Sequence, residues 1–221
     1  AVALLRLNNS LRPVIDAQSD AVKQSLGGDL LISMPMVVLV GDQSSGKTSV
    51  LEMLTGVSLP RGANCQTRVP VELHLKTASK VDEEACTVSY TKDTNTIVKE
   101  CAFKDIEAVV LKAHKELTAN ECDTTDVTLV IEARKCGQEE LTIADLPGIT
   151  HLANRAENAH ILRVYDKYMK QKDAIIVNVV SATCGILTSQ SIALSRECDP
   201  SGERTLVCIT KIDQHKEKGL N

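Results

Sequence analysis

The chain contains very few aromatic residues. Aromatic side chains make up 2% of its 221 residues, with no tryptophan and one phenylalanine. Proteins that bind single-stranded nucleic acid stack the bases on aromatic rings, so this scarcity argues against direct nucleic-acid binding. The formal net charge of −4 agrees, because it offers no general attraction to phosphate polymers or to anionic lipid. Any anion that the chain binds must therefore be held by a local site.

The sequence also lacks targeting segments and paired cysteines. It shows no signal peptide and no apolar run near membrane-spanning length, which predicts a cytoplasmic protein. Its eight cysteines include no C-x-x-C pair, and several lie inside apolar runs. We expect reduced thiols that fill small apolar spaces, with disulfides or a zinc site as the alternatives. The eight are Cys65, Cys86, Cys101, Cys122, Cys136, Cys184, Cys198 and Cys208.

A core rich in valine, isoleucine, leucine and alanine is typical of a parallel α/β sheet, and 221 residues suit one sizeable domain. We expect an amphipathic N-terminal helix in residues 1–28 and one α/β domain in 29–221. Strands and helices alternate along that domain, which predicts a doubly wound, mostly parallel sheet with helices on both faces. Strands are expected at 34–40, 71–76, 173–180 and 204–210, with a strand pair in 81–102 and another two strands in 126–148. Helices are expected after residue 46 and at 103–119, 153–170 and 187–198.

The segment "GDQSSGKT" matches the spacing G-x-x-x-x-G-K-[ST] at Gly41, Gly46, Lys47 and Thr48. An apolar run precedes it and a helical pattern follows it, which is the setting of a phosphate-binding loop. Backbone N–H groups and a helix N-terminus offer partial positive charge there, and Lys47 adds a full charge. The alternative is an ordinary turn between a strand and a helix, with a solvated lysine.

Two further segments follow predicted strands directly. In "DLPG", Asp145 is placed to bind Mg²⁺ through water, and Gly148 leaves a backbone N–H free to approach a terminal phosphate. In "TKID", the carboxylate of Asp213 can accept both the N1–H and the 2-amino group of guanine, while the stem of Lys211 can pack along the base. Each segment, taken alone, is also compatible with a simple strand end.

A polar, turn-rich loop at 58–70 contains one hydroxyl between its prolines, that of Thr67. A threonine in such a loop could complete the shell of Mg²⁺ and orient a water molecule when a γ-phosphate closes the loop. A loop residue that faces solvent is the alternative. Together with the phosphate loop, these segments favour a guanine nucleotide bound with Mg²⁺.

The segments "GDQSSGKTSVLE", "LPRG", "LTIADLPGIT", "DPSGERT" and "TKID" resemble the GTPase domain of the dynamin superfamily. Among its branches, the sequence is most similar to the interferon-induced Mx proteins. The resemblance implies a P-loop GTPase fold and a large, low-affinity GTPase that hydrolyses GTP to GDP and phosphate. It also implies self-association, with turnover stimulated when two GTPase domains meet, and a possible part in antiviral defence. Any membrane or viral target would lie in a stalk beyond this sequence.

The resemblance also assigns site residues. The catalytic set that it implies is Gln43, Ser44, Lys47, Thr67 and Gly148. Mg²⁺ would be held by Thr48, by Thr67 and, through water, by Asp145, and a monovalent cation (Na⁺ or K⁺) partly by Ser44. The nucleotide-binding set is Gly41, Asp42, Gln43, Ser44, Ser45, Gly46, Lys47, Thr48, Ser49, Asp145, Leu146, Pro147, Gly148, Ile149, Thr210, Lys211, Ile212 and Asp213.

The sequence departs from the family pattern in three places. Asn64 stands where the family usually has a glycine near the cation, although asparagine tolerates positive φ better than most residues. Thr48 replaces the commoner serine, and either hydroxyl can bind Mg²⁺. The chain stops at Asn221, so we expect a domain that is truncated at its C-terminus.

The departure at Asn64 motivates a different function, that of a nucleotide-gated binding module with negligible hydrolysis. A dynamin that remodels membranes, rather than an Mx protein, would carry the same motifs. A P-loop ATPase or small-molecule kinase would share the phosphate loop, but Asp213 disfavours it, because adenine would leave that carboxylate unpaired.

Overall fold

The computed structural model describes residues 36–60, 69–92, 95–117, 127–138, 140–149, 159–185 and 188–216. The expected N-terminal helix therefore lies outside the described residues. So do Thr67 and Asn64 of the polar loop.

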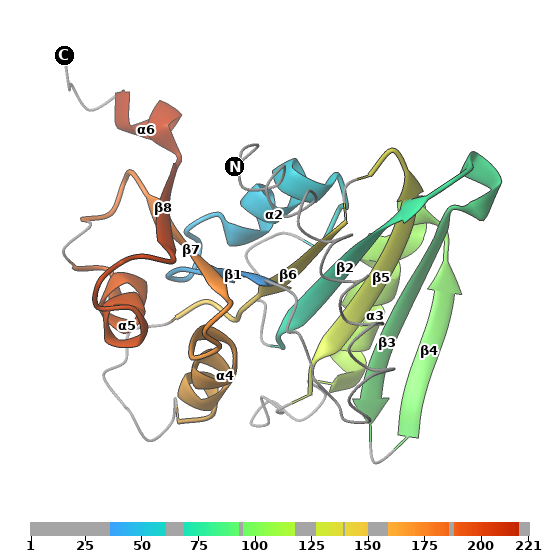
Figure 1. Cartoon of the computed structure of the whole chain (residues 1–221), viewed down its shortest axis with the longest axis horizontal. Helices are drawn as coiled ribbons and strands as arrows, with labels where there is room; N and C mark the ends of the chain where they lie inside the picture. Colours follow the sequence, from blue (N-terminus) through green and yellow to red (C-terminus); the bar gives the residue numbers. More distant parts are fainter. Residues whose placement is uncertain are drawn as a thin grey trace, which may run out of the picture.

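Eight strands form one sheet in the order β4-β3-β5-β2-β6-β1-β7-β8 (Figure 1). Strands β6, β1, β7 and β8 are parallel to one another, β2 is antiparallel to β6, and β3 is antiparallel to both β5 and β4. The predicted α/β sheet is confirmed, with four parallel and three antiparallel pairings. The strands are β1 (Met36–Val40), β2 (Val71–Ala78), β3 (Ala85–Lys92), β4 (Asn95–Cys101), β5 (Leu129–Cys136), β6 (Leu141–Asp145), β7 (Ile175–Ser181) and β8 (Thr205–Thr210).

Helices cover both faces of the sheet, as predicted. One buried cluster joins α2 and α3 to the sheet, and a second joins α4 to the opposite face, with Leu194 of α5 packed at its margin. Strand β1 serves both clusters because its side chains alternate: Leu39 belongs to the first, and Val38 and Val40 to the second. The helices are α2 (Lys47–Thr55), α3 (Ile106–Leu117), α4 (Ala159–Met169), α5 (Gln190–Cys198) and α6 (Ile212–Lys216), with short 3-10 turns η1 (Val81–Glu83) and η2 (Phe103–Asp105).

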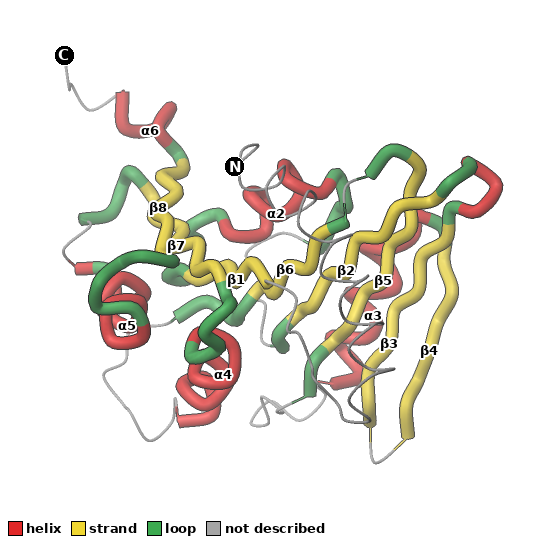
Figure 2. The backbone as a smooth tube through the Cα atoms, in the orientation of Figure 1, coloured by secondary structure: helices red, strands yellow, loops and turns green. Residues whose placement is uncertain are grey.

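Most elements lie where the sequence predicts them, and two differ. The strands β5 and β6, which the sequence predicts as two strands in 126–148 with a turn near Gly137, do not pair with each other, because β2 lies between them. Helix α6 begins at Ile212, in a segment that the sequence predicts to be a polar strand end. Because β1, β6 and β8 run parallel within the sheet, their carboxyl ends, with the loops that follow, lie at the same end of the strands. Figure 2 shows these strands in the order β6, β1, β7, β8.

Strand β8 forms one edge of the sheet and exposes apolar side chains. Leu206, Val207 and Ile209 are 43%, 55% and 47% exposed, and they point to both faces of the strand. The strand is therefore apolar on both faces, and the described residues leave these side chains only partly covered.

The described cysteines are free thiols, as expected. Cys86 is buried in the core, but Cys136 and Cys184 are exposed, so not every cysteine fills an apolar space. None of the helices in the described part of the chain combines the length and the apolar character that a membrane crossing requires.

Candidate functional site

The loop between β1 and α2 has the backbone of an anion-binding turn. Ser44 and Gly46 both adopt left-handed conformations, with φ of 61° and 98°. Gly46 caps the N-terminus of α2, where a non-glycine residue at this φ would be strained. Left-handed residues within a loop turn successive N–H groups toward one concave side, which suits an anion. The hydroxyl of Ser45 is buried there with no hydrogen-bond partner among the described residues.

The ammonium group of Lys47 lies over this loop. Lys47 is 7% exposed, and its Nζ donates to the carbonyl oxygens of Gly41 at 3.0 Å and Asp42 at 3.3 Å. Burial lowers the pKa of Lys47, and the carboxylates of Asp145 and Asp42 oppose that shift. The loop after β1 therefore holds a buried ammonium group against its own carbonyl oxygens.

Asp145, the last residue of β6, lies across from the first turn of α2. Thr48 Oγ1 donates to Asp145 Oδ2 at 3.4 Å, whereas the buried Oδ1 has no hydrogen-bond partner among the described residues. Burial raises the pKa of Asp145 to about 6, while Lys47 and Thr48 oppose the shift. A carboxylate oxygen without a partner beside a threonine hydroxyl is a pair of oxygen ligands of the kind that Mg²⁺ prefers. These residues fit the Mg²⁺ that the family resemblance implies.

The D-x-x-G segment runs directly along the phosphate loop. The Gln43 N–H donates to the Ile149 carbonyl at 3.0 Å, and the Ile149 N–H donates to the Gly41 carbonyl at 3.3 Å. A Cβ atom added to Gly148 would lie 3.0 Å from Gln43 Cα and 3.3 Å from Lys47 Nζ. Glycine at position 148 therefore allows this backbone to approach the lysine and the loop closely.

The end of β8 and the residue that follows it contact the loop as well. Thr210 Oγ1 donates to the carbonyl of Ser45 at 2.5 Å, and Lys211 Nζ donates to the carbonyl of Ser44 at 2.8 Å. We expected the Lys211 stem to pack along a base, and the described contact ties its ammonium group to the loop backbone. Asp213 lies exposed in the first turn of α6, two residues further on.

The remaining residues of the predicted site fall into an exposed group and a buried group. The side chains of Gln43, Ser44 and Ser49 are exposed around the phosphate loop, and Ile212 is 54% exposed in α6. Leu146, Pro147 and Ile149 are buried instead, with Leu146 and Ile149 in the second core cluster. These three contribute backbone groups beside the loop: the Leu146 N–H donates to the Leu39 carbonyl at 3.2 Å.

The sequence did not predict two contacts of the site. The backbone N–H of Ser191, in the first turn of α5, donates to Asp42 Oδ1 at 3.2 Å. The hydroxyl of Tyr165 on α4 donates to the carbonyl of Pro147 at 2.6 Å. The helix expected at 153–170 gives no sign of this contact, because periodicity does not distinguish a buried hydroxyl from a buried ring.

The family model described as "Dynamin family" matches residues 37–212, which include the phosphate loop, D-x-x-G and most of "TKID". The chain belongs to the dynamin family. This chain is 34% identical over 207 residues to the interferon-induced GTP-binding protein Mx2 of Ictalurus punctatus, and 36% identical over 211 residues to interferon-induced GTP-binding protein Mx of Larimichthys crocea. It is 35% identical over 214 residues to dynamin-related protein 4C of Arabidopsis thaliana.

These alignments cover 92%, 94% and 95% of this dynamin-family chain. They cover 32%, 33% and 31% of the three relatives, so the chain spans about a third of the length of each.

Proposed function

We propose that this chain binds GTP and hydrolyses it to GDP and phosphate. The phosphate loop, the D-x-x-G segment and the "TKID" segment are far apart in the sequence. They support this proposal because they meet at the carboxyl ends of the parallel strands. The observation that carries it is the contact of Thr210 and Lys211 with the carbonyls of Ser45 and Ser44. That contact joins the segment with the guanine-binding pattern to the loop with the phosphate-binding pattern.

In this proposal, the backbone of residues 41–48 and the ammonium group of Lys47 bind the β- and γ-phosphates. The N–H of Gly148 donates to the γ-phosphate, since its backbone lies beside Lys47 and Gln43. From the family resemblance, Gln43 and Thr67 orient the attacking water, and Ser44 stabilises the leaving oxygens. Asp213 accepts from guanine and sets the preference over adenine.

We assign the Mg²⁺ ligands to Thr48 and Thr67, with Asp145 acting through water. The unpartnered Oδ1 of Asp145 and the adjacent Thr48 hydroxyl support this assignment. Bound Mg²⁺ would neutralise charge on the phosphate oxygens. The role of Thr67, and that of a monovalent cation beside Ser44, rests on the family resemblance alone.

We also propose a role beyond nucleotide hydrolysis. Assembly-stimulated turnover through paired GTPase domains, a cytoplasmic location and a part in antiviral defence would follow if the chain works like an Mx protein. The two relatives named as interferon-induced GTP-binding proteins favour that branch. The dynamin-related protein of equal similarity favours a second candidate, a dynamin of the membrane-remodelling kind. Turnover per molecule that rises with protein concentration would support assembly stimulation in either branch, and constant turnover would oppose it.

Competition between nucleotides tests the core proposal. A fluorescent GDP analogue is bound to the chain in the presence of Mg²⁺ and displaced with GTP or ATP. We expect GTP to displace it at a concentration at least tenfold lower than ATP, because adenine leaves the Asp213 carboxylate unpaired. Equal displacement by both nucleotides would contradict the assignment of guanine. The Lys47→Ala variant serves as the control for binding in the phosphate loop.

A further inference from the structure

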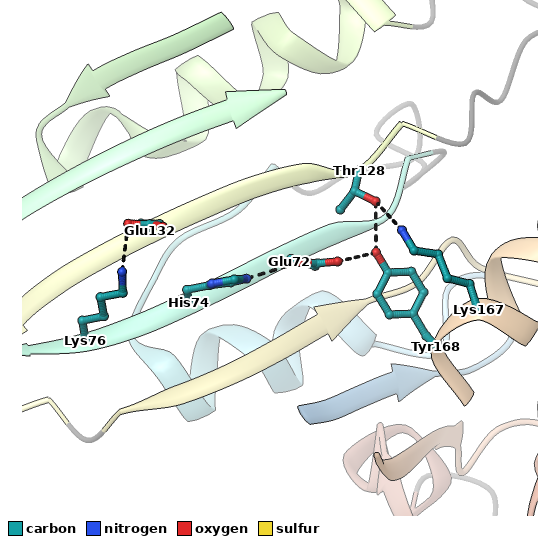
Figure 3. A network of polar contacts seen from close by, with 7 residues as sticks. All are labelled: Glu72, His74, Lys76, Thr128, Glu132, Lys167 and Tyr168. Atoms are coloured by element: carbon teal, nitrogen blue, oxygen red, sulfur yellow. Dashed lines mark hydrogen bonds and ion pairs between the residues drawn. The ribbon is translucent and has the colours of Figure 1, made fainter. Parts of the chain in front are cut away.

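Helix α4 carries two buried tyrosines one turn apart, and their hydroxyls hold different parts of the molecule. Tyr165 and Tyr168 are 2% and 1% exposed. The Tyr165 hydroxyl donates to the carbonyl of Pro147, in the D-x-x-G segment. The Tyr168 hydroxyl donates to Glu72 Oε1 on β2 at 2.5 Å and lies 3.0 Å from Thr128 Oγ1, within the polar network of Figure 3.

The hydrogen bond from Tyr165 to the Pro147 carbonyl also affects the next N–H, because both groups belong to one peptide. The carbonyl of Pro147 and the N–H of Gly148 belong to the same planar peptide, and in a trans peptide they point in opposite directions. A hydrogen bond that fixes the carbonyl therefore fixes the direction of the N–H as well. A donor to the carbonyl also polarises the peptide and makes its N–H a stronger donor.

The surroundings keep the Tyr165 hydroxyl protonated. Burial raises its pKa, and the carboxylates of Asp145 and Asp42 add to the shift, whereas the backbone amide of Gly41 opposes it. The hydroxyl therefore stays protonated at neutral pH and acts as the donor to the Pro147 carbonyl.

We propose that Tyr165 is a positioning residue that aims the Gly148 N–H at the γ-phosphate by holding the Pro147 carbonyl. This inference rests on the proposed function. GDP lacks a γ-phosphate, so Tyr165 contributes to the binding and hydrolysis of GTP and hardly at all to the binding of GDP. A tyrosine that only fills the core would affect both nucleotides equally.

The test compares Tyr165→Phe with a matched control, Tyr168→Phe. Each variant removes one hydroxyl from a buried tyrosine of the same helix, and each removed hydroxyl donates a short hydrogen bond. The measured quantity is the ratio of two dissociation constants, that of a non-hydrolysable GTP analogue and that of GDP, with Mg²⁺ present. Titrations at low temperature are fitted with free stoichiometry, so that only the folded fraction of a destabilised variant is counted.

We expect Tyr165→Phe to weaken binding of the analogue about fivefold relative to GDP and to lower single-turnover hydrolysis about tenfold. Tyr168→Phe should leave the ratio within about twofold of the wild type, even if it lowers the unfolding temperature by the same amount. An unchanged ratio in Tyr165→Phe, or equal changes in both variants, would overturn the inference while leaving the proposed function standing. A wild-type chain that binds neither nucleotide would overturn both.

Discussion

The hydroxyl of Thr48 donates a hydrogen bond to Asp145 Oδ2 at 3.4 Å across a separation of 97 residues. This contact joins the first turn of α2 to the end of β6. The other oxygen of the same carboxylate is buried and has no partner among the described residues. A buried carboxylate in this state destabilises the fold unless a cation or a proton accompanies it, so the site should respond to pH.

Stability of the nucleotide-free and Mg²⁺-free protein should therefore fall as the carboxyl group of Asp145 ionises. Its pKa is raised from 3.8 to about 6, so the folded chain binds this proton more tightly than the unfolded chain does. The resulting stabilisation is fully present below pH 3.8 and is lost as pH rises through about 6. Against Asp145→Asn, we expect the wild type to lose roughly 2–3 kcal/mol of unfolding free energy between about pH 4 and pH 7.

Urea unfolding in EDTA at several pH values measures this difference. The control is Asp82→Asn, which alters an exposed carboxylate in η1 and should give a curve parallel to that of the wild type. Parallel curves for Asp145→Asn and the wild type would contradict the account of Asp145. With Mg²⁺ and GTP added, Asp145→Asn should gain much less stability than the wild type, because it lacks the carboxylate assigned to the metal.

Base preference should change when the carboxylate of Asp213 becomes an amide. Asp213→Asn replaces two acceptor oxygens with one acceptor and one donor, which suits the 2-oxo group of xanthine better than the 2-amino group of guanine. We expect preference to move from GTP toward xanthosine triphosphate by about tenfold or more, measured by displacement of a fluorescent nucleotide. Unchanged preference for GTP would mean that "TKID" is only the start of α6.

Binding and hydrolysis should separate between two variants. Lys47→Ala removes the buried charge over the loop and should abolish binding of both GDP and GTP. Thr67→Ala should bind GDP like the wild type, while single-turnover hydrolysis falls about tenfold or more. Equal loss of GDP binding in the two variants would contradict the catalytic assignment of Thr67.

The sequence predicted the segments of the candidate site better than the contacts that join them. The phosphate loop and α2 were predictable because the spacing of the motif agrees with the apolar run before it and the helical pattern after it. The insertion of β2 between β5 and β6 was not, since strand pairing depends on tertiary contacts. The hydrogen bond of the Tyr165 hydroxyl could not be predicted either, because burial of the ring alone accounts for the apolar periodicity of this helix.

The exposed apolar side chains of β8 should bind an apolar dye. Val207 and Ile209 lie on the same face of the strand, about half exposed. We expect the chain to enhance the fluorescence of such a dye, and Val207→Lys with Ile209→Lys to lower the signal about twofold or more with little change in unfolding free energy. The matched control is Val81→Lys with Val98→Lys, which alters two side chains that are 73% and 61% exposed elsewhere. An equal effect of both pairs, or no dye binding by the wild type, would contradict this prediction.

Hydrolysis of guanine nucleotide at this site can be measured in a single turnover. The protein is held in excess over GTP labelled at the γ-phosphate, with Mg²⁺ present and Na⁺ or K⁺ varied, and phosphate release is followed. We expect phosphate release from GTP, release from ATP that is slower by about tenfold or more, and none from GTP with Lys47→Ala. GTP that binds but releases no phosphate under any of these conditions would contradict the claim and leave a binding module in its place.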